Sequence, residues 1–182
     1  GIDLLRDHVD TLIVIPNERL LDIAEADTSL IEAFERADEV LYNATRGISD
    51  LITVHGLINL DFADVETTMR DGGTALMGAA SAAGKERARK AAVQAISSPL
   101  LDGLSINGAR NVLVNITAGS SLGIREATEA TGVVQKEAGE DVEVIFGTVI
   151  DEEMGEDMRV TVIATGFDDD HTHGAMAEAE EA

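Results

Sequence analysis

A short polar segment in the first half of the chain places two carboxylates and an amide close together. The segment GLINLDFADVETTM contains Asn59, Asp61 and Asp64, and no lysine or arginine follows it before Arg70. Carboxylates three residues apart near a helix start can share one face. Such a pair can act as a general base toward water or hold Mg²⁺ through water, and an amide can orient that water. The structural alternative is that Asp61 or Asp64 only caps the next helix, where a carboxylate favours the helix dipole.

A second candidate pair lies upstream. Phe34 and Asp38 are four residues apart, so they share one face of a helix. An aromatic ring with a carboxylate one turn later can stack on a purine and accept hydrogen bonds from its N–H groups. The alternative is a core phenylalanine beside a solvated aspartate. His171 and His173 stand beside three aspartates, where a weak metal site competes with a solvated tail.

The sequence shows no motif that would hold a triphosphate. It has neither a GxxxxGK[ST] loop nor a GxGxxG motif after a strand. No Ser/His/Asp or Cys/His grouping stands out either. The chain on its own therefore offers no recognisable phosphate cradle.

A long helix must position both candidate pairs. Ser29 and Glu32 form a capping-box pattern at its start, and His55-Gly56 suits its end. Gly47 lies inside it and indicates a close approach, because glycine costs a helix about 1 kcal/mol relative to alanine. A second helix is predicted to begin at Phe62 or Ala63. Apolar residues alternate spacings of four and three along the long helix, which predicts one apolar stripe over roughly 37 Å: Leu30, Phe34, Ala37, Leu41, Ala44, Ile48 and Leu51.

The remaining elements predict an α/β (α+β) fold, with the long central helix followed by a small mixed sheet packed by helices on one side. Residues 9–15 read as a buried strand with few partners in this chain, and residues 168–182 as a disordered tail. The other elements are predicted strands at 74–83, 110–117, 142–149 and 158–165, and predicted helices at 18–24, 84–96 and 124–138.

Composition limits the class of protein and its partners. The chain has 182 residues, 45% of them hydrophobic, no cysteine and a net charge of −22. Such acidity argues against nucleic acid or an anionic membrane as a partner, and no apolar run is long enough to cross a bilayer. We expect a soluble, intracellular protein that starts inside a longer product, since its first residue is glycine. The spread of acidic residues favours adaptation to high salt over a functional acidic surface.

Six motifs in order resemble the prokaryotic tubulin-like cell-division GTPase FtsZ, over Gly1 to Phe167. They are VDTLIVIPNERLL, SLIEAFERADEVL, GLINLDFADVETTM, AISSPLL, GARNVLVNITAG and RVTVIATGF. The resemblance implies four parts: residues 1–26 as the last strand and loop of a truncated GTP-binding domain, 27–55 as the central helix, 56–167 as a tubulin-like C-terminal domain, and 168–182 as an acidic tail. The family's glycine-rich phosphate loop and its C-terminal peptide are both absent from the sequence.

The resemblance also implies roles for the candidate residues. Asn59, Asp61 and Asp64 match the synergy loop, which acts on the GTP of the next subunit in a head-to-tail homopolymer. Phe34 and Asp38 match the guanine contacts, and Asn17 approaches the nucleotide. GTP or GDP and Mg²⁺ would be bound mainly by the missing N-terminal domain and the neighbouring subunit.

Further expectations follow from the family. They are hydrolysis only in the full-length polymer, a cytoplasmic division-site location, membrane-anchoring proteins as partners through the missing peptide, no direct membrane insertion, and a salt-loving archaeal source. One alternative is a non-catalytic module that caps filament ends. Another is a free-standing acidic metal enzyme that uses Asp61 and Asp64.

Overall fold

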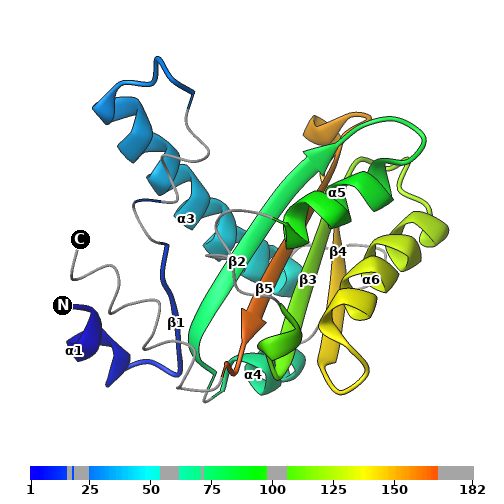
Figure 1. Ribbon diagram of the computed structural model, residues 1–182. Coiled ribbons are helices and arrows are strands. Elements are labelled where there is room, and N and C mark those ends of the chain that lie inside the picture. Colours follow the sequence, from blue (N-terminus) through cyan, green and yellow to red (C-terminus); the bar gives the residue numbers. More distant parts are fainter. Residues whose placement is uncertain (16–17, 19–24, 54–61, 71, 98–105, 168–182) are drawn as a thin grey trace.

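A mixed five-stranded sheet forms the centre of the fold (Figure 1). The computed structural model describes residues 1–15, 18, 25–53, 62–70, 72–97 and 106–167. Strand β5 runs antiparallel to β2 and β3, while the pairs β1–β2 and β3–β4 are parallel. The sheet is therefore mixed, as predicted. Its strands are β1 (Thr11–Ile13), β2 (Gly73–Ala82), β3 (Asn111–Ala118), β4 (Glu143–Ile150) and β5 (Met158–Thr165), in the spatial order β1-β2-β5-β3-β4.

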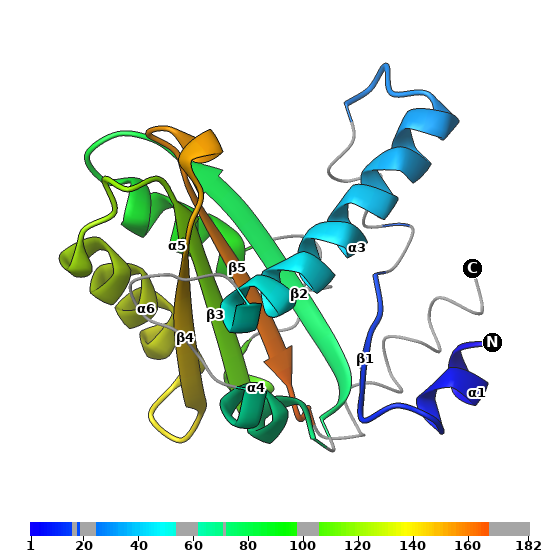
Figure 2. The ribbon, with the colours of Figure 1, turned by 180° about the vertical axis from the view of Figure 1, so that it is seen from behind.

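The two helices that alternate with the strands of the second half lie on one side of the sheet, as predicted, and the long helix covers the other face, which was not predicted. Helices α5 and α6 lie on one face, and α3 crosses the other (Figures 1 and 2). The bounds are α1 (Ile2–Arg6), α3 (Leu30–Thr53), α4 (Phe62–Met69), α5 (Arg87–Ile96) and α6 (Ile124–Ala138), with short 3₁₀ turns at Ile106–Gly108 and Glu152–Met154. No described helix is long and apolar enough to cross a membrane.

The strands show why two covered faces are required. Along β3, Val112, Val114 and Ile116 belong to the core cluster that includes residues of α5 and α6. Leu113 belongs instead to a smaller cluster with Ala44 and Leu51 of α3. Because successive side chains of a strand point to opposite faces, an almost uninterrupted apolar strand requires packing on both sides.

Helix α3 starts as the sequence predicts but is buried over only part of its length. At its first turn the Ser29 backbone N–H donates to Glu32 Oε2 at 2.8 Å, and the Glu32 N–H donates to Ser29 Oγ at 3.3 Å. Hydrogen bonds to the Glu32 carboxyl from the Ser29 backbone and side chain, followed by the charge of Arg36, lower the pKa of Glu32. Ala44, Gly47 and Leu51 are buried.

The first half of the predicted stripe is exposed, because the helix projects beyond the edge of the sheet (Figure 2). Leu30 is 73% exposed, Phe34 54% and Leu41 44%. At 24 residues, α3 is about 36 Å long. The apolar stripe is therefore continuous along the sequence, while its burial against this chain is confined to the second half of the helix.

The N-terminal strand has one partner strand among the described residues, in line with the expectation that this chain offers few. β1 pairs in parallel with β2, with Thr11 opposite Gly73 and Ile13 opposite Ala75. Thr11 Oγ1 also donates to the Met69 carbonyl at the end of α4. Strand β1 thus extends the sheet by a short edge strand.

A buried arginine joins the beginnings of α5 and α6. Arg87 is only 4% exposed, and its Nε and Nη2 atoms bind the two Glu126 carboxylate oxygens at 2.7 and 2.9 Å. Its Nη1 donates to the Glu156 carbonyl at 2.7 Å. Glu126 Oε2 accepts a second bond, from the Gly123 N–H at 3.0 Å. The Arg87 bond lowers the pKa of Glu126 and raises that of Arg87.

Candidate functional site

Asp64 is the candidate carboxylate that falls within the described residues. It lies in the first turn of α4 and is exposed. Asn59 and Asp61 lie outside the described residues. Arg70, the first cation after the segment, forms an ion pair with Glu66 on α4. The position of Asp64 in the first turn suits a favourable interaction with the helix dipole, and its side chain is exposed.

Two hydrogen bonds anchor the helices that flank residues 54–61. Before this segment, the Asn115 side chain of β3 donates from Nδ2 to the Gly47 carbonyl of α3 at 2.9 Å. After it, Thr165 Oγ1 of β5 donates to the Thr68 carbonyl of α4 at 3.0 Å. β3 and β5 are paired neighbours. The helices on either side of residues 54–61 are thus hydrogen-bonded to adjacent strands of one sheet.

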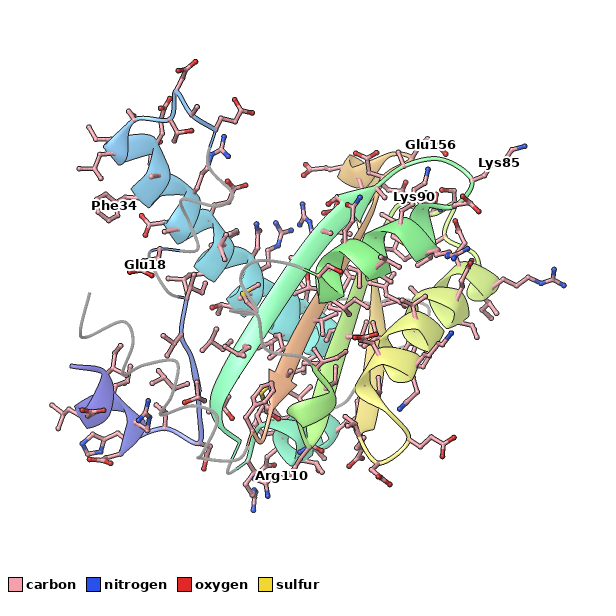
Figure 3. All side chains as sticks on the ribbon, viewed as in Figure 1. Glu18, Phe34, Lys85, Lys90, Arg110 and Glu156 are labelled. Atoms are coloured by element: carbon pink, nitrogen blue, oxygen red, sulfur yellow. The ribbon has the colours of Figure 1, made fainter. Side chains whose placement is uncertain are left out.

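The other candidate pair, Phe34 and Asp38, lies on the projecting half of α3. Both side chains are exposed, and Phe34 points away from the sheet (Figure 3). One helical turn separates them, which leaves an open aromatic face with a carboxylate acceptor beside it. This arrangement fits a planar base that has N–H donors on one edge. Asn17 lies outside the described residues.

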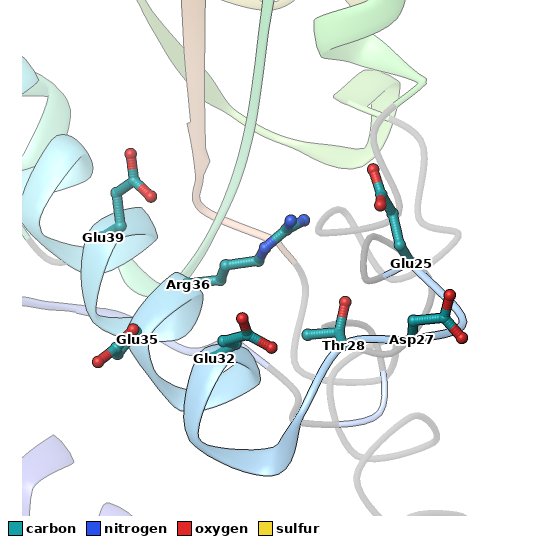
Figure 4. A pocket seen from close by; sticks show the side chains of 7 residues that line it. All are labelled: Glu25, Asp27, Thr28, Glu32, Glu35, Arg36 and Glu39. Atoms are coloured by element: carbon teal, nitrogen blue, oxygen red, sulfur yellow. The ribbon is translucent and has the colours of Figure 1, made fainter.

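A hollow of about 360 Å³ beside the start of α3 was not foreseen from the sequence. Its lining comes from the segment before α3 and from one face of that helix (Figure 4). Five carboxylates and one cation line it, a charge balance that repels phosphate. By helical geometry this face differs from the one that carries Phe34 and Asp38. The lining residues are Glu25, Asp27, Thr28, Glu32, Glu35, Arg36 and Glu39.

Asp64 does not meet Phe34 and Asp38 in one site. Figure 1 shows α4, which carries Asp64, at one end of the sheet and away from the projecting start of α3. Phe34 lies 19 residues before the end of α3 at Thr53, or about 29 Å along the helix. Within the described residues, Phe34 and Asp38 therefore lie apart from Asp64.

The described residues do not form a metal site on their own. Among them, no group of three or more His, Cys, Asp or Glu side chains could hold a metal ion. Asp64 could contribute one carboxylate oxygen, a ligand type that Mg²⁺ accepts. A Mg²⁺ ion here would need further ligands from Asn59, Asp61 or another molecule.

Sequence reasoning missed Asn115, Thr165 and Arg87. A signal for Asn115 was present, because one amide interrupts the apolar strand NVLVNIT and is only 5% exposed. A buried polar group requires a hydrogen-bond partner. The partner proved to be the carbonyl of Gly47, the glycine for which a close approach was predicted. That prediction is confirmed, since a Cβ at position 47 would lie 3.0 Å from Asn115 Nδ2.

Comparisons with known proteins agree with this architecture. The family described as FtsZ family, C-terminal domain, matches residues 73–168. The solved M. jannaschii FtsZ dimer is 41% identical, with a TM-score of 0.86, and the match covers 91% of this chain and 48% of that one. This chain thus spans about half the length of that relative.

More distant solved structures share the fold alone. TubZ from Bacillus thuringiensis serovar israelensis, in GDP-form protofilaments, is 13% identical, with a TM-score of 0.71 and coverage of 94% of this chain and 46% of that one. CetZ1 from Haloferax volcanii, a GDP-bound monomer, is 18% identical, with a TM-score of 0.70 and coverage of 94% and 51%. The family match extends over more than half of the residues, and the chain belongs to the FtsZ family.

Proposed function

We propose that the chain is the central-helix and C-terminal part of a filament-forming GTPase. We further propose that its acidic segment, with Asn59, Asp61 and Asp64, completes GTP hydrolysis on the adjacent subunit. The observation that carries this proposal is the separation of Asp64 from Phe34 and Asp38. Asp64 is exposed on α4, and Phe34 and Asp38 are exposed on the projecting half of α3. Carboxylates that act on a neighbour's nucleotide have no need to lie near their own subunit's base-contacting residues.

The exposed half of α3 supports the presence of further chain in the complete protein. Leu30, Ile31 and Phe34 are each more than half exposed, and relatives of about twice the length match. We assign residues 1–26 to the end of a GTP-binding domain, 27–55 to the central helix, 56–167 to the C-terminal domain and 168–182 to an acidic tail. A cytoplasmic division-site location, membrane-anchoring partners and a salt-loving source belong to the same proposal.

The proposed mechanism is one of positioning. The Phe34 ring stacks on the guanine, and the Asp38 carboxylate accepts from its N1–H and N2–H groups. Asp61 and Asp64 hold the attacking water at the neighbour's γ-phosphate, with Asn59 orienting it. Mg²⁺, when bound, neutralises charge on the phosphates. Most of the rate gain in such phosphoryl transfers comes from placing the water and the charges correctly.

A mixing assay tests the proposal. A full-length FtsZ whose own loop carboxylates have been replaced is assembled with GTP in high salt, and this chain is added while phosphate release is followed. We expect the chain alone to be inactive and the mixture to recover release. Asp64→Asn should abolish the recovery, whereas Glu129→Gln, which removes an exposed carboxylate from α6, should leave it intact.

Two outcomes would contradict the proposal. Phosphate release by the chain alone, sensitive to Asp64→Asn, would indicate a free-standing enzyme. Binding to filaments without any recovery of release would show that the carboxylates are structural. Shortened filaments at substoichiometric chain would then indicate a capping module.

A further inference from the structure

The contact between α3 and the sheet has an apolar part and a polar part. The apolar part brings Ala44 and Leu51 of α3 against sheet residues that include Met77, Leu113 and Ile163. The polar part lies beside Gly47 and contains a cavity of only about 20 Å³. We call this polar part the seam. Its lining residues are Asn43, Arg46, Gly47, Asp50, Asn115, Thr117, Asp151, Arg159 and Thr161.

One directional bond crosses the buried floor of the seam. Asn115 Nδ2 donates to the Gly47 carbonyl, while Asn115 Oδ1 accepts from Thr117 Oγ1 at 3.4 Å. The Gly47 carbonyl can only accept, so Nδ2 must face α3, and the Thr117 hydroxyl binds the remaining amide oxygen. A carbonyl has two lone pairs, so Gly47 can accept this bond in addition to the one within the helix. The absence of a side chain on Gly47 lets the amide reach the helix backbone.

The other polar connection across the seam is weaker. Arg46 Nη2 lies 4.0 Å from Asp151 Oδ2, and the Arg46 side chain is 51% exposed. Arg46 also binds Asp50 on its own helix, from Nε to Oδ2 at 3.1 Å. Exposed pairs of this kind are screened by salt and fix geometry poorly. Apolar contacts are non-directional, so they hold the helix against the sheet without selecting which backbone carbonyl meets Asn115.

We propose that Asn115 is a positioning residue, which sets the register of α3 on the sheet and thereby the position of Thr53, where the helix ends. Gly47 lies six residues before Thr53, the end of α3, which is about 9 Å of rigid helix. A shift at Gly47 therefore moves Thr53 by the same amount. The effect on hydrolysis rests on the proposed function, whereas the effect on helix register does not.

The register can be measured on the chain as it is. The sequence has no cysteine, so Thr53→Cys on α3 and Glu137→Cys on α6 accept a pair of spin labels at exposed positions. We expect one narrow distance distribution for the parent chain. Asn115→Leu should add a population displaced by up to about one helical turn, 5.4 Å.

Thr161→Val is the matched control. Thr161 is 4% exposed, lines the same seam and lies opposite Asn115 in the β3–β5 register. It should leave the distribution narrow, because it does not touch the Gly47 bond. Asn115→Asp, which keeps the shape of the side chain and removes its N–H donor, replaces Asn115→Leu if the latter does not fold. An unchanged distribution in a folded Asn115 variant, or an equal change in Thr161→Val, would overturn the proposal.

The mixing assay gives the functional readout. Asn115→Leu should lower the maximal rate of phosphate release at least fivefold, while the concentration of chain for half-maximal stimulation changes less than twofold. A structural role alone would reduce the folded fraction and raise that concentration. If Asp64→Asn abolishes stimulation and Asn115→Leu does not reduce it, the positioning role of Asn115 is refuted while the proposed function stands. If Asp64→Asn has no effect, the proposed function fails, and the spin-label distances still decide the register.

Discussion

The buried Arg87–Glu126 pair allows a quantitative prediction for the fold. Arg87 Nε and Nη2 contact both Glu126 oxygens at 2.7 and 2.9 Å, and the arginine is 4% exposed. Arg87→Met keeps the volume and removes the charge. It leaves the Glu126 carboxylate without its cation and the Glu156 carbonyl without its donor. Removing one partner of a buried pair costs roughly 3–5 kcal/mol.

The lower end of that range applies here. The Glu126 side chain retains 27% exposure, so water can solvate part of the abandoned carboxylate. We expect Arg87→Met to lower the free energy of unfolding by about 3 kcal/mol. With a urea m-value of about 2 kcal/mol/M, the unfolding midpoint of the chain should fall by about 1.5 M. A decrease of the midpoint by less than about 0.5 M would contradict this prediction, because the pair would then behave like a surface ion pair.

The pH dependence supplies an independent check. Arg87 lowers the pKa of Glu126 in the folded chain below its ordinary value of 4.5. A lowered pKa contributes stability above the unfolded pKa and loses it as the pH falls through the folded pKa. Glu126→Gln keeps an acceptor for the Gly123 N–H and removes the charge. The stability difference between the parent and Glu126→Gln should be full at pH 7 and shrink progressively below pH 4.5. A constant difference from pH 7 to pH 3 would contradict the assignment.

Four further substitutions test other parts of the chain. Gly132→Ala, in the open interior of α6, should raise the free energy of unfolding by about 0.5–1 kcal/mol. Gly119→Ala should lower it by roughly 1–3 kcal/mol, because its Cβ would lie 2.7 Å from the Gly155 carbonyl oxygen. Equal urea midpoints for the two variants would contradict this pair of predictions. Ser29→Ala should cost the first turn of α3 about 1 kcal/mol, seen as roughly fivefold faster amide exchange there, and unchanged exchange would count against the capping box. Phe34→Ala should leave the free energy of unfolding of the chain unchanged, because Phe34 is 54% exposed. The same change should lower the GTP affinity of the filament-forming protein about tenfold. An unaltered affinity would show that Phe34 does not contact the base.

Local elements could be predicted because local signals specify them. The predicted helix at 124–138 and the predicted strand at 158–165 match α6 and β5 residue for residue. The helix lies between Gly123 and Gly139, and apolar periodicity inside it is unbroken. The capping box at Ser29 and the close approach at Gly47 were likewise read from residue types whose chemistry has few other uses in a helix.

The arrangement of the elements could not be read from the same signals. A run of apolar residues in a strand shows burial and does not say which helix covers each face, so α3 was not placed on the sheet. The pairing of β1 with β2 depends on contacts 62 residues apart in sequence, as between Thr11 and Gly73. The apolar stripe of α3 shows a need for packing and does not identify the partner, which explains why half of it is exposed here.

The difference between the two halves of α3 links these findings to the proposed assembly. Its projecting half carries Phe34 and Asp38, and its buried half is attached through Asn115 to the sheet that also holds α4 and Asp64. On the proposed function, a subunit contributes base contacts at one end and carboxylates at the other, so a complete site requires two subunits in the same orientation. Such a contact joins two different surfaces, and a contact of this type that does not close into a ring continues as a filament. Hydrolysis and assembly are then coupled by geometry, because the water-positioning carboxylates arrive only with the next subunit.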